Sequence, residues 1–545
     1  MLAADEIPNT IYAQVFETDQ KRPFSDTEPL LIDALEPTRS LSFNTIHNNV
    51  RAFASALRST DYGIKQGDVV AICSPSDIEY AIALHGIMAA GAGACLIPAV
   101  LTSNEMANIL RLAEPRLIVA HPASYQVIQE AIQEYGVDLP LVIMHKNKAD
   151  ALSSCPNLLD LCHQHDPHQP LPPVNPDAIA YLACTSGSVA AMKLVTISHR
   201  VGVLRIRELA ATMTRTANER SRSLATSQFH GALTSAITLQ ASLQCGIRQY
   251  VLNSNDLELM LSKIQEFQIT SVSLAPFNVV QAANRPELIQ KYNVSSLQVG
   301  TTAGQMVRRE DKIKAKENLR LALMLTFYGS TESYVPLGFI PQHNIPETSG
   351  KIPDREGWSV KLVDEHGQEV QKGEMGELWA KEPTLANGYY KCPEDTAEAF
   401  DKDGFFHTKD IFILQDNDEF LFIGRKNEMI LTKDSKYCAP KPIEDICLTH
   451  GGIRECIVVG AHSKKLGYQL PRAYVVLKDP ESVADKDAFI KELTAYVNER
   501  VPKDVMRLDG GMRILDQFPR TAVGKTDMQL LRNLASQELE QMESS

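Results

Sequence analysis

The sequence predicts an α/β protein with two domains, and three observations lead to this prediction. Short apolar runs that read as strands alternate with helical patterns along most of the chain, as in a largely parallel sheet covered by helices. The 545 residues are too many for one compact core. After residue 427 the pattern changes to a shorter mixture of strands and helices. We therefore predict a large N-terminal domain, residues 1–426, and a small α+β C-terminal domain, residues 427–545.

Periodicity locates the first elements. Apolar residues at successive spacings of 3, 4, 3 and 4 predict an amphipathic helix near the start, carried by Phe43, Ile46, Val50, Phe53 and Leu57. Short β-branched and apolar runs predict buried strands. These runs are VVAICS (69–74), IAYLAC (179–184), CIVVGA (456–461) and RAYVVLK (472–478). The stretch KDAFIKELTAYVNERV (486–501) predicts a helix in the C-terminal domain.

A polar, proline-rich and histidine-rich segment spans residues 145–178 and predicts a surface connection. It contains CHQHDPH (162–168), whose cysteine and histidines resemble a metal-binding tract. No second ligand cluster follows at a spacing typical of zinc sites. We therefore interpret this tract as solvated loop.

Composition argues against several classes of function. The net charge is 54 − 67 = −13, which is unfavourable for sequence-independent binding to nucleic acid or to an anionic membrane. No stretch approaches the ~20 apolar residues that cross a bilayer, and the start lacks the pattern of a secretory signal. The ten cysteines are scattered without a CxxC pair. This usage favours reduced thiols and a cytoplasmic location.

The stretch CTSGSVAAMK (184–193) has the chemistry of a phosphate-binding loop. It follows a predicted strand, its hydroxyl groups and glycine allow donors to approach phosphate oxygens, and a lysine adds positive charge. The candidate ligands are Thr185, Ser186, Gly187, Ser188 and Lys193. Turns rich in serine and threonine also occur without a ligand, so this motif alone does not decide the function.

Three further motifs follow in order. In FYGSTES (327–333), Tyr328 can stack on a base, and Glu332 can hold Mg²⁺. In GFFHTKD (404–410), Asp410 can accept hydrogen bonds from two ribose hydroxyls, and Arg425 follows in IGRKNEMI. In PRTAVGKTDM (519–528), Lys525 lies on a glycine-bearing turn. Each residue also has a structural interpretation: a core aromatic, a surface acid, a helix cap and a solvated lysine.

Taken together, the four motifs resemble the adenylate-forming superfamily, which includes acyl-CoA synthetases, adenylation domains and luciferases. The resemblance extends from SFNTIHNNVRAFASALRS to FPRTAVGKTDMQLLR and is most specific in GEMGELWAKEPTLANGYYKCPEDTAEAFDKDGFFHTKD. It implies a large N-terminal AMP-binding domain and a small mobile C-terminal lid that rotates between two half-reactions. It also implies ATP, Mg²⁺ and CoA as cofactors and a small carboxylic acid as substrate.

The resemblance assigns roles to individual residues. It places adenine against Tyr328, Gly329, Thr302 and Ala303, and ribose against Asp410 and Arg425. Thr331 would contact the α-phosphate and Glu332 would bind the metal. Catalytic roles are expected for Lys525 in the adenylation step and for His230, which would gate the acyl pocket.

The chain also departs from the family pattern. Val189, Ala190 and Leu194 stand where the loop normally has a hydroxyl and two glycines, and Lys409 replaces the glycine of the motif TGD. We therefore expect adenylate to bind well and ATP comparatively poorly. The preferred function is an acid–CoA ligase for a mostly apolar monocarboxylic acid. The alternatives are transfer of the acyl group to a carrier protein or an amine, and a non-catalytic protein that binds a nucleotide or acyl-CoA.

Overall fold

The computed structural model describes most of the chain and divides it into two units. The described residues are 8–19, 21–145, 155–185, 192–214, 218–304, 307–334, 348–352, 356–433, 436–519 and 526–544. Contacts group residues 1–360 and 380–406 into unit 1, and residues 361–379 and 407–545 into unit 2. This grouping follows contacts and does not test the predicted domain boundary at residue 427, which stays a prediction.

A six-stranded sheet in unit 1 carries the phosphate-loop motif. Its order is β6-β5-β3-β4-β7-β8, and all neighbouring pairs are parallel except β7 and β8, which form an antiparallel hairpin. The strands are β3 (Val69–Cys73), β4 (Gly93–Ile97), β5 (Leu117–Ala120), β6 (Leu141–Ile143), β7 (Ile179–Cys184) and β8 (Leu194–Ser198). The strands predicted at 69–74 and 179–184 are thus confirmed.

Helices cover both faces of this sheet, which explains its continuous apolar strands. On β3, Val70 and Ile72 pack into one cluster with helices α1 (Ile11–Phe16), α2 (Phe43–Arg58), α3 (Tyr80–Ala89) and α7 (His199–Met213). The alternate residues of β3 pack on the opposite face with α4 (Ser103–Ala113) and α5 (Tyr125–Tyr135). Helix α2 begins after Ser42, whose side chain accepts from the Thr45 backbone N–H, and it confirms the first predicted helix.

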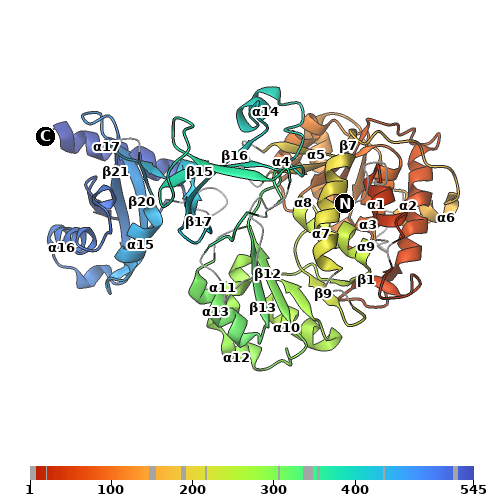
Figure 1. Cartoon of the computed structure of the whole chain (residues 1–545), viewed down its shortest axis with the longest axis horizontal. Helices are drawn as coiled ribbons and strands as arrows, with labels where there is room; N and C mark the ends of the chain where they lie inside the picture. The colour runs from red at the N-terminus through yellow and green to blue at the C-terminus, as the bar shows by residue number, and fades with distance from the viewer. Residues whose placement is uncertain are drawn as a thin grey trace. The chain divides into compact units, whose positions relative to one another are not determined.

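A seven-stranded sheet completes unit 1. Its order is β13-β12-β11-β9-β10-β1-β2, parallel except for β1 and β2. The strands are β1 (Pro29–Asp33), β2 (Ser40–Ser42), β9 (Arg222–Ala225), β10 (Arg248–Val251), β11 (Ser271–Ser273), β12 (Val299–Ala303) and β13 (Leu323–Phe327). Helices α10 (Leu257–Phe267), α11 (Pro276–Asn284), α12 (Pro286–Ile289) and α13 (Arg309–Asn318) pack against it (Figure 1).

The remaining helices of unit 1 are short. Residues 232–245 form α8 (Ala232–Thr234), a π-helix (Ser235–Ala241) and α9 (Ser242–Cys245). A 3₁₀ turn (Pro122–Ser124) precedes α5. Helix α14 (Pro393–Ala399) lies between the motifs FYGSTES and GFFHTKD in the sequence. Helix α6 (Leu158–Gln164) crosses the histidine-rich segment, so the prediction of a loop is wrong there. Cys162 is buried on this helix and donates to the Asn49 carbonyl, because the helix packs on α2.

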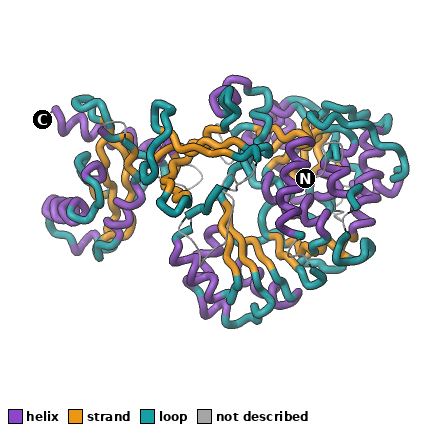
Figure 2. Tube along the Cα trace, in the orientation of Figure 1, coloured by secondary structure: helices purple, strands orange, loops and turns teal. Residues whose placement is uncertain are grey.

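Unit 2 combines sheets and helices of the predicted α+β type (Figure 2). The four-stranded sheet β14-β15-β16-β17 comprises Ser359–Val363, Met375–Lys381, Phe406–Leu414 and Phe420–Arg425. After a 3₁₀ turn (Lys426–Glu428) come β18 (Ile430–Leu431), β19 (Tyr437–Cys438), α15 (Pro440–Leu448), β20 (Ile453–His462) and β21 (Gln469–Leu477). The chain continues with 3₁₀ turns Pro480–Ser482 and Asp504–Met506, which flank α16 (Lys486–Asn498), then β22 (Met512–Ile514) and α17 (Met528–Ser544). The strands predicted at 456–461 and 472–478 and the helix over 486–501 are confirmed. None of the described helices is long and apolar enough to cross a membrane.

Candidate active site

The phosphate-loop motif joins β7 to β8, and its two described ends are held together. The Thr185 backbone N–H donates to the Lys193 carbonyl at 2.9 Å. The Lys193 backbone N–H donates to the Thr185 hydroxyl oxygen at 3.2 Å, which leaves that hydroxyl its own proton to donate. These two hydrogen bonds between Thr185 and Lys193 close the base of the loop, which we call its neck, and they fix where the loop begins and ends. Ser186, Gly187 and Ser188 lie outside the described residues.

The Lys193 side chain contacts two groups to which the sequence motifs assigned no role. Its ammonium group lies 2.6 Å from the Asp395 carboxylate of α14 and 4.8 Å from the centre of the Tyr389 ring. All three side chains are partly exposed, so the ion pair is a weak restraint that a phosphate can replace. The contact positions the lysine charge at the neck of the loop.

Tyr389 also contacts the predicted metal ligand. Its hydroxyl donates to Oε1 of Glu332 at 2.8 Å, and Glu332 is 8% exposed. Burial and the nearby carboxylate raise the pKa of Tyr389, so the phenol stays neutral and remains a donor. Among the described residues, Tyr389 is the only side chain that hydrogen-bonds this carboxylate. The second carboxylate oxygen is therefore available for a hard cation, which fits the predicted Mg²⁺ role.

The structure thus brings Lys193 and Glu332 to one aromatic residue, although they are far apart in sequence. The segment that contains Tyr389 is fixed on β8 by backbone hydrogen bonds between Thr196 and residues 387 and 388, at 2.9 Å each. A Cβ at Gly388, where φ is +102°, would lie 2.4 Å from the Thr396 side chain, so this turn requires glycine. The predicted site of unit 1 has a rigid support.

The residues predicted to contact adenine lie at neighbouring strand ends. Thr302 and Ala303 end β12 and pair in register with Thr326 and Phe327 of β13, and Tyr328 follows directly. The Thr302 hydroxyl oxygen is buried and has no hydrogen-bond partner among the described residues. The carboxyl ends of parallel strands are a common place for ligands. The structure therefore groups these candidates, while their contact with a base stays a prediction.

His230 lies just before α8 in unit 1. Burial lowers its pKa to about 4, so the ring is neutral at physiological pH. Its Nδ1 atom is buried without a hydrogen-bond partner among the described residues. The preceding Phe229 is fully buried and packs edge-on against Tyr80. A neutral ring suits an uncharged part of a substrate better than a second carboxylate.

In unit 2, Asp410 and Arg425 face each other on β16 and β17. They are direct cross-strand partners, and Arg425 Nε lies 3.0 Å from Asp410 Oδ1. Asp410 is buried, whereas Arg425 is half exposed. Asp410 lies within a strand, so it is not a helix cap. Lys409 adopts a left-handed φ of +57°, which gives a physical reason why glycine is usual at this position. Lys525 lies outside the described residues.

A second polar cluster lies just beyond β3, β5 and β6. One ligand atom each of Asp77, His121 and His145 lie within 4.8 Å of one another. Arg39 already donates to both Asp77 oxygens, at 3.0 and 3.2 Å. His121 Nδ1 accepts from the backbone N–H two residues further on, so the other nitrogen of the neutral ring carries the proton. The Arg39 guanidinium therefore already neutralises the Asp77 carboxylate, and the cluster needs no metal ion for that purpose.

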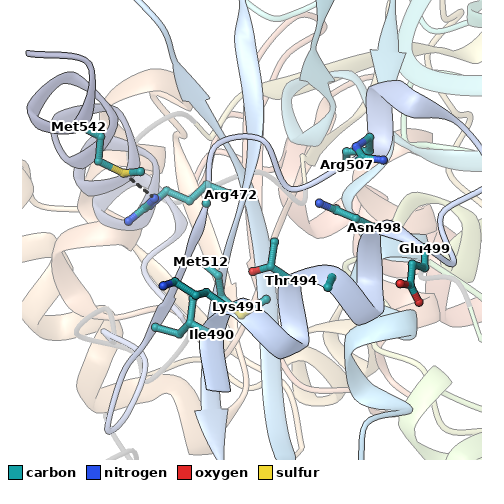
Figure 3. Close-up of a pocket in the computed structure, with 11 residues that line it drawn as sticks. Arg472, Ile490, Lys491, Thr494, Asn498, Glu499, Arg507, Met512 and Met542 are labelled. Atoms are coloured by element: carbon teal, nitrogen blue, oxygen red, sulfur yellow. Dashed lines mark hydrogen bonds between the residues drawn. The ribbon is translucent and has the colours of Figure 1, made fainter. Parts of the chain in front are cut away.

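A cavity of about 620 Å³ lies within unit 2, and none of the predicted site residues lines it. Figure 3 shows Lys491 and Thr494 of α16 beside Met512 of β22 and Arg472 of β21. The Arg472 guanidinium is already paired with Glu538 at 2.6 Å. The cavity therefore offers mainly apolar wall and no unpaired buried charge among its described residues.

Comparisons with known proteins agree with the motifs. Residues 18–390 match the family described as AMP-binding enzyme, and residues 442–525 match the AMP-binding enzyme C-terminal domain. The chain is 27% identical over 532 residues to a phenylacetyl-CoA ligase of Aspergillus niger, covering 96% of each protein.

Two solved structures share the fold. The anthranilate CoA ligase AuaEII in complex with anthranoyl-AMP has a TM-score of 0.77 at 21% identity, with 98% of this chain and 99% of that chain covered. The amide bond synthetase McbA of Marinactinospora thermotolerans has a TM-score of 0.76 at 20% identity, with 97% and 99% covered. They confirm the predicted fold class, a large α/β N-terminal domain with a smaller C-terminal domain.

Proposed function

The chain belongs to the AMP-binding enzyme family, and from this premise we propose that it activates a carboxylic acid with ATP and transfers the acyl group to CoA. In the first step a carboxylate oxygen attacks the α-phosphorus of ATP, and the bond from that phosphorus to pyrophosphate breaks. In the second step the CoA sulfur attacks the acyl carbon, AMP leaves, and the thiol proton passes to solvent.

The observation that carries this proposal is the grouping of Lys193 and Glu332 around Tyr389. Negative charge accumulates on phosphoryl oxygens during the first step, so the protein has to place positive charge and donors beside them. Lys193 would contact the phosphates from the neck of the loop, and the Thr185 hydroxyl would donate to them. Tyr389 contacts both Lys193 and Glu332.

Glu332 would hold Mg²⁺ through the carboxylate oxygen that Tyr389 does not occupy. The metal would supply charge neutralisation for the departing pyrophosphate. The protein's own contribution is to bury this carboxylate and to fix its direction with a neutral phenol. A buried carboxylate with one oxygen fixed loses little freedom when it binds a ligand.

The residues proposed for the nucleoside are those that the sequence motifs assign to it. Tyr328, Thr302 and Ala303 are proposed for adenine, and Asp410 with Arg425 for ribose. Asp410 is pre-oriented by Arg425, so its carboxylate needs little rearrangement to accept from hydroxyl groups. Lys525 is proposed to contact the reacting groups in the first step, on sequence alone.

The substrate is proposed to be a largely apolar monocarboxylic acid, aromatic or aliphatic. The neutral ring of His230 and the buried Phe229 support an uncharged acyl pocket. The phenylacetyl-CoA ligase of A. niger supports the same class of acid. A second carboxylate would need a basic partner, and His230 is too poorly solvated to become one at neutral pH.

The first test is ATP–pyrophosphate exchange with a panel of aryl, medium-chain and dicarboxylic acids. We expect exchange that depends on the monocarboxylic acids, and release of AMP that depends on CoA. Exchange in which an amine or a carrier protein, and not CoA, stimulates AMP release would assign another acceptor. Absence of exchange with every acid, in a protein that binds adenylate, would favour the non-catalytic alternative.

A further inference from the structure

Arg205 is a fully buried arginine on α7, and each of its guanidinium nitrogens donates to a backbone carbonyl. Nε donates to Thr384 at 2.9 Å, Nη1 to Thr331 at 3.3 Å, and Nη2 to Glu332 at 3.0 Å. The guanidinium also lies 3.8 Å from the centre of the Tyr334 ring. One side chain therefore joins the segment that carries the predicted metal ligand to the segment that leads to Tyr389.

These bonds restrict the backbone at the predicted metal ligand. The Glu332 carbonyl accepts from Arg205 and also from the Ala386 backbone N–H at 2.8 Å. Its side chain accepts from Tyr389. Residues 384–389 therefore hold both the main chain and the side chain of Glu332. Loss of the guanidinium would leave three carbonyls, those of Thr384 and Glu332 buried and that of Thr331 partly buried, with fewer donors.

One buried carboxyl group, that of Glu382, interacts electrostatically with Arg205. No carboxylate among the described residues lies within ion-pair distance of the guanidinium, but Glu382 contributes electrostatically and is 5% exposed. Ser333 donates to Oε1 of Glu382 at 2.8 Å, and Oε2 has no hydrogen-bond partner among the described residues. A buried guanidinium needs compensating charge or dipoles, and Glu382 supplies the charge.

We propose that Arg205 and Glu382 are positioning residues that fix Thr331 and Glu332 for metal–nucleotide binding. The inference rests on the proposed function of Glu332 as metal ligand. Neither residue is proposed to contact the reacting atoms. Arg205 fixes the backbone through its three hydrogen bonds, and Glu382 supports Arg205 electrostatically and Ser333 through a hydrogen bond.

The charge state of Glu382 makes this arrangement dependent on pH. Burial raises the pKa of Glu382 to about 7, while Ser333 and Arg205 act to lower it. The other groups facing it, the Thr384 side chain and the Tyr334 backbone N–H, do not titrate. The phenols of Tyr181 and Tyr334 beside Arg205 have raised pKa values because of burial, so they stay neutral. Of the titratable groups named here, Glu382 is the one whose pKa lies between pH 6 and 8.

The test uses binding of Mn²⁺–ATP to the full chain, measured by the electron paramagnetic resonance of bound Mn²⁺. The variants are Arg205→Met, Arg205→Lys and Glu382→Gln. Arg200→Met is the matched control, because Arg200 lies in the first turn of the same helix and its side chain, among the described residues, forms only an exposed ion pair with Asp177. AMP binding without metal is measured in parallel, and thermal melting reports folding.

We expect Arg205→Met to weaken Mn²⁺–ATP binding at least tenfold and AMP binding by a smaller factor, because AMP brings the α-phosphate that Thr331 would contact but no metal. Arg205→Lys should recover part of the loss, because an ammonium keeps the charge and some of the donors. Arg200→Met should match the wild type. A folded Arg205→Met protein with Mn²⁺–ATP binding within threefold of the wild type would overturn the proposal.

If Arg205→Met does not fold, Arg205→Lys and Glu382→Gln decide. Glu382→Gln should match the wild type at pH 6 and bind Mn²⁺–ATP at least threefold more weakly at pH 8. The ratio of the two proteins' dissociation constants for Mn²⁺–ATP cancels the titration of ATP itself. A ratio that is flat with pH, or a lysine variant equal to the wild type, would contradict the positioning role.

These outcomes are separate from the proposed function. A wild-type protein that binds Mn²⁺–ATP but shows no acid-dependent pyrophosphate exchange would refute the acid-activating function and leave the positioning inference standing. Variants that bind like the wild type, in a protein that exchanges normally, would refute only the inference.

Discussion

The two units present nucleotide-binding candidates that are built in different ways. In unit 2, Asp410 and Arg425 are opposite residues on adjacent strands, so a single hairpin places them. In unit 1, Lys193, Glu332 and Tyr389 come from three separate segments, and a fourth segment supplies Arg205. A locally built pair tolerates changes elsewhere, whereas an assembled site depends on residues that touch no ligand.

The largest effect is expected at the assembled site. Glu332→Gln should lower the rate of acid-dependent pyrophosphate exchange by at least ~10²-fold, because a charged metal ligand is lost. Glu287→Gln, on the exposed surface of α12, is the matched control and should leave the rate unchanged. Exchange near the wild-type rate in the Glu332 variant would remove this residue from the site.

At the locally built pair the effect should fall on nucleotide affinity. Asp410→Ala should raise the KM for ATP by roughly 10- to 10²-fold, because two hydrogen bonds to a carboxylate are worth about 1.5–3 kcal/mol each and water replaces part of them. Steady-state kinetics and AMP calorimetry measure this change. Unchanged affinity would reassign Asp410 to a structural role in which it pairs with Arg425.

Glu382 should lower the folding stability of the chain at high pH, because ionising this buried carboxyl group costs more than its attraction to Arg205 returns. Its pKa of about 7 lies above that of an unfolded glutamate, so the folded state favours the protonated form. The resulting stabilisation is complete below pH ~4 and is lost as the pH rises through 7, by up to about 3 kcal/mol. Glu382→Gln should therefore melt progressively higher than the wild type between pH 5 and 8. If the melting temperatures of the two proteins differed by the same amount at every pH, the pKa of Glu382 would not change on folding.

The smallest effect is expected at Lys409. A left-handed φ costs a side chain about 1–2 kcal/mol, and glycine costs about 0.5–1 kcal/mol of chain entropy. Lys409→Gly should therefore stabilise the protein by roughly 0.5–1 kcal/mol in denaturant unfolding. Lys402→Gly, at an exposed position without a left-handed φ, serves as the comparison and should not stabilise. A loss of stability in the Lys409 variant would mean that its side chain makes compensating contacts.

Local sequence signals predicted most of the fold. The 3–4 spacing of apolar residues located α2, and β-branched runs located β3, β7, β20 and β21, because burial of one face or of a whole strand determines these patterns. The loop prediction failed over α6. There the buried side chains of Leu158 and Leu161 pack on the core, although the surrounding stretch is polar and rich in histidine.

The sequence predicted candidate ligands but not the residues that hold them. Tyr389 stands in a quoted motif, yet its contacts with Lys193 and Glu332 arise only when distant segments pack. Arg205 gave no signal, because a single arginine in a helix normally faces solvent. Such residues act through backbone carbonyls, which any sequence provides. Their roles are therefore visible only in three dimensions.

The most direct test of acid activation follows an oxygen atom. A substrate acid labelled with ¹⁸O in both carboxylate oxygens is incubated with the enzyme, ATP and CoA, and the AMP is examined by mass spectrometry. Attack of the carboxylate on the α-phosphorus predicts one ¹⁸O in each AMP formed and none in pyrophosphate. AMP without label, or label in inorganic phosphate instead, would contradict an acyl-adenylate intermediate.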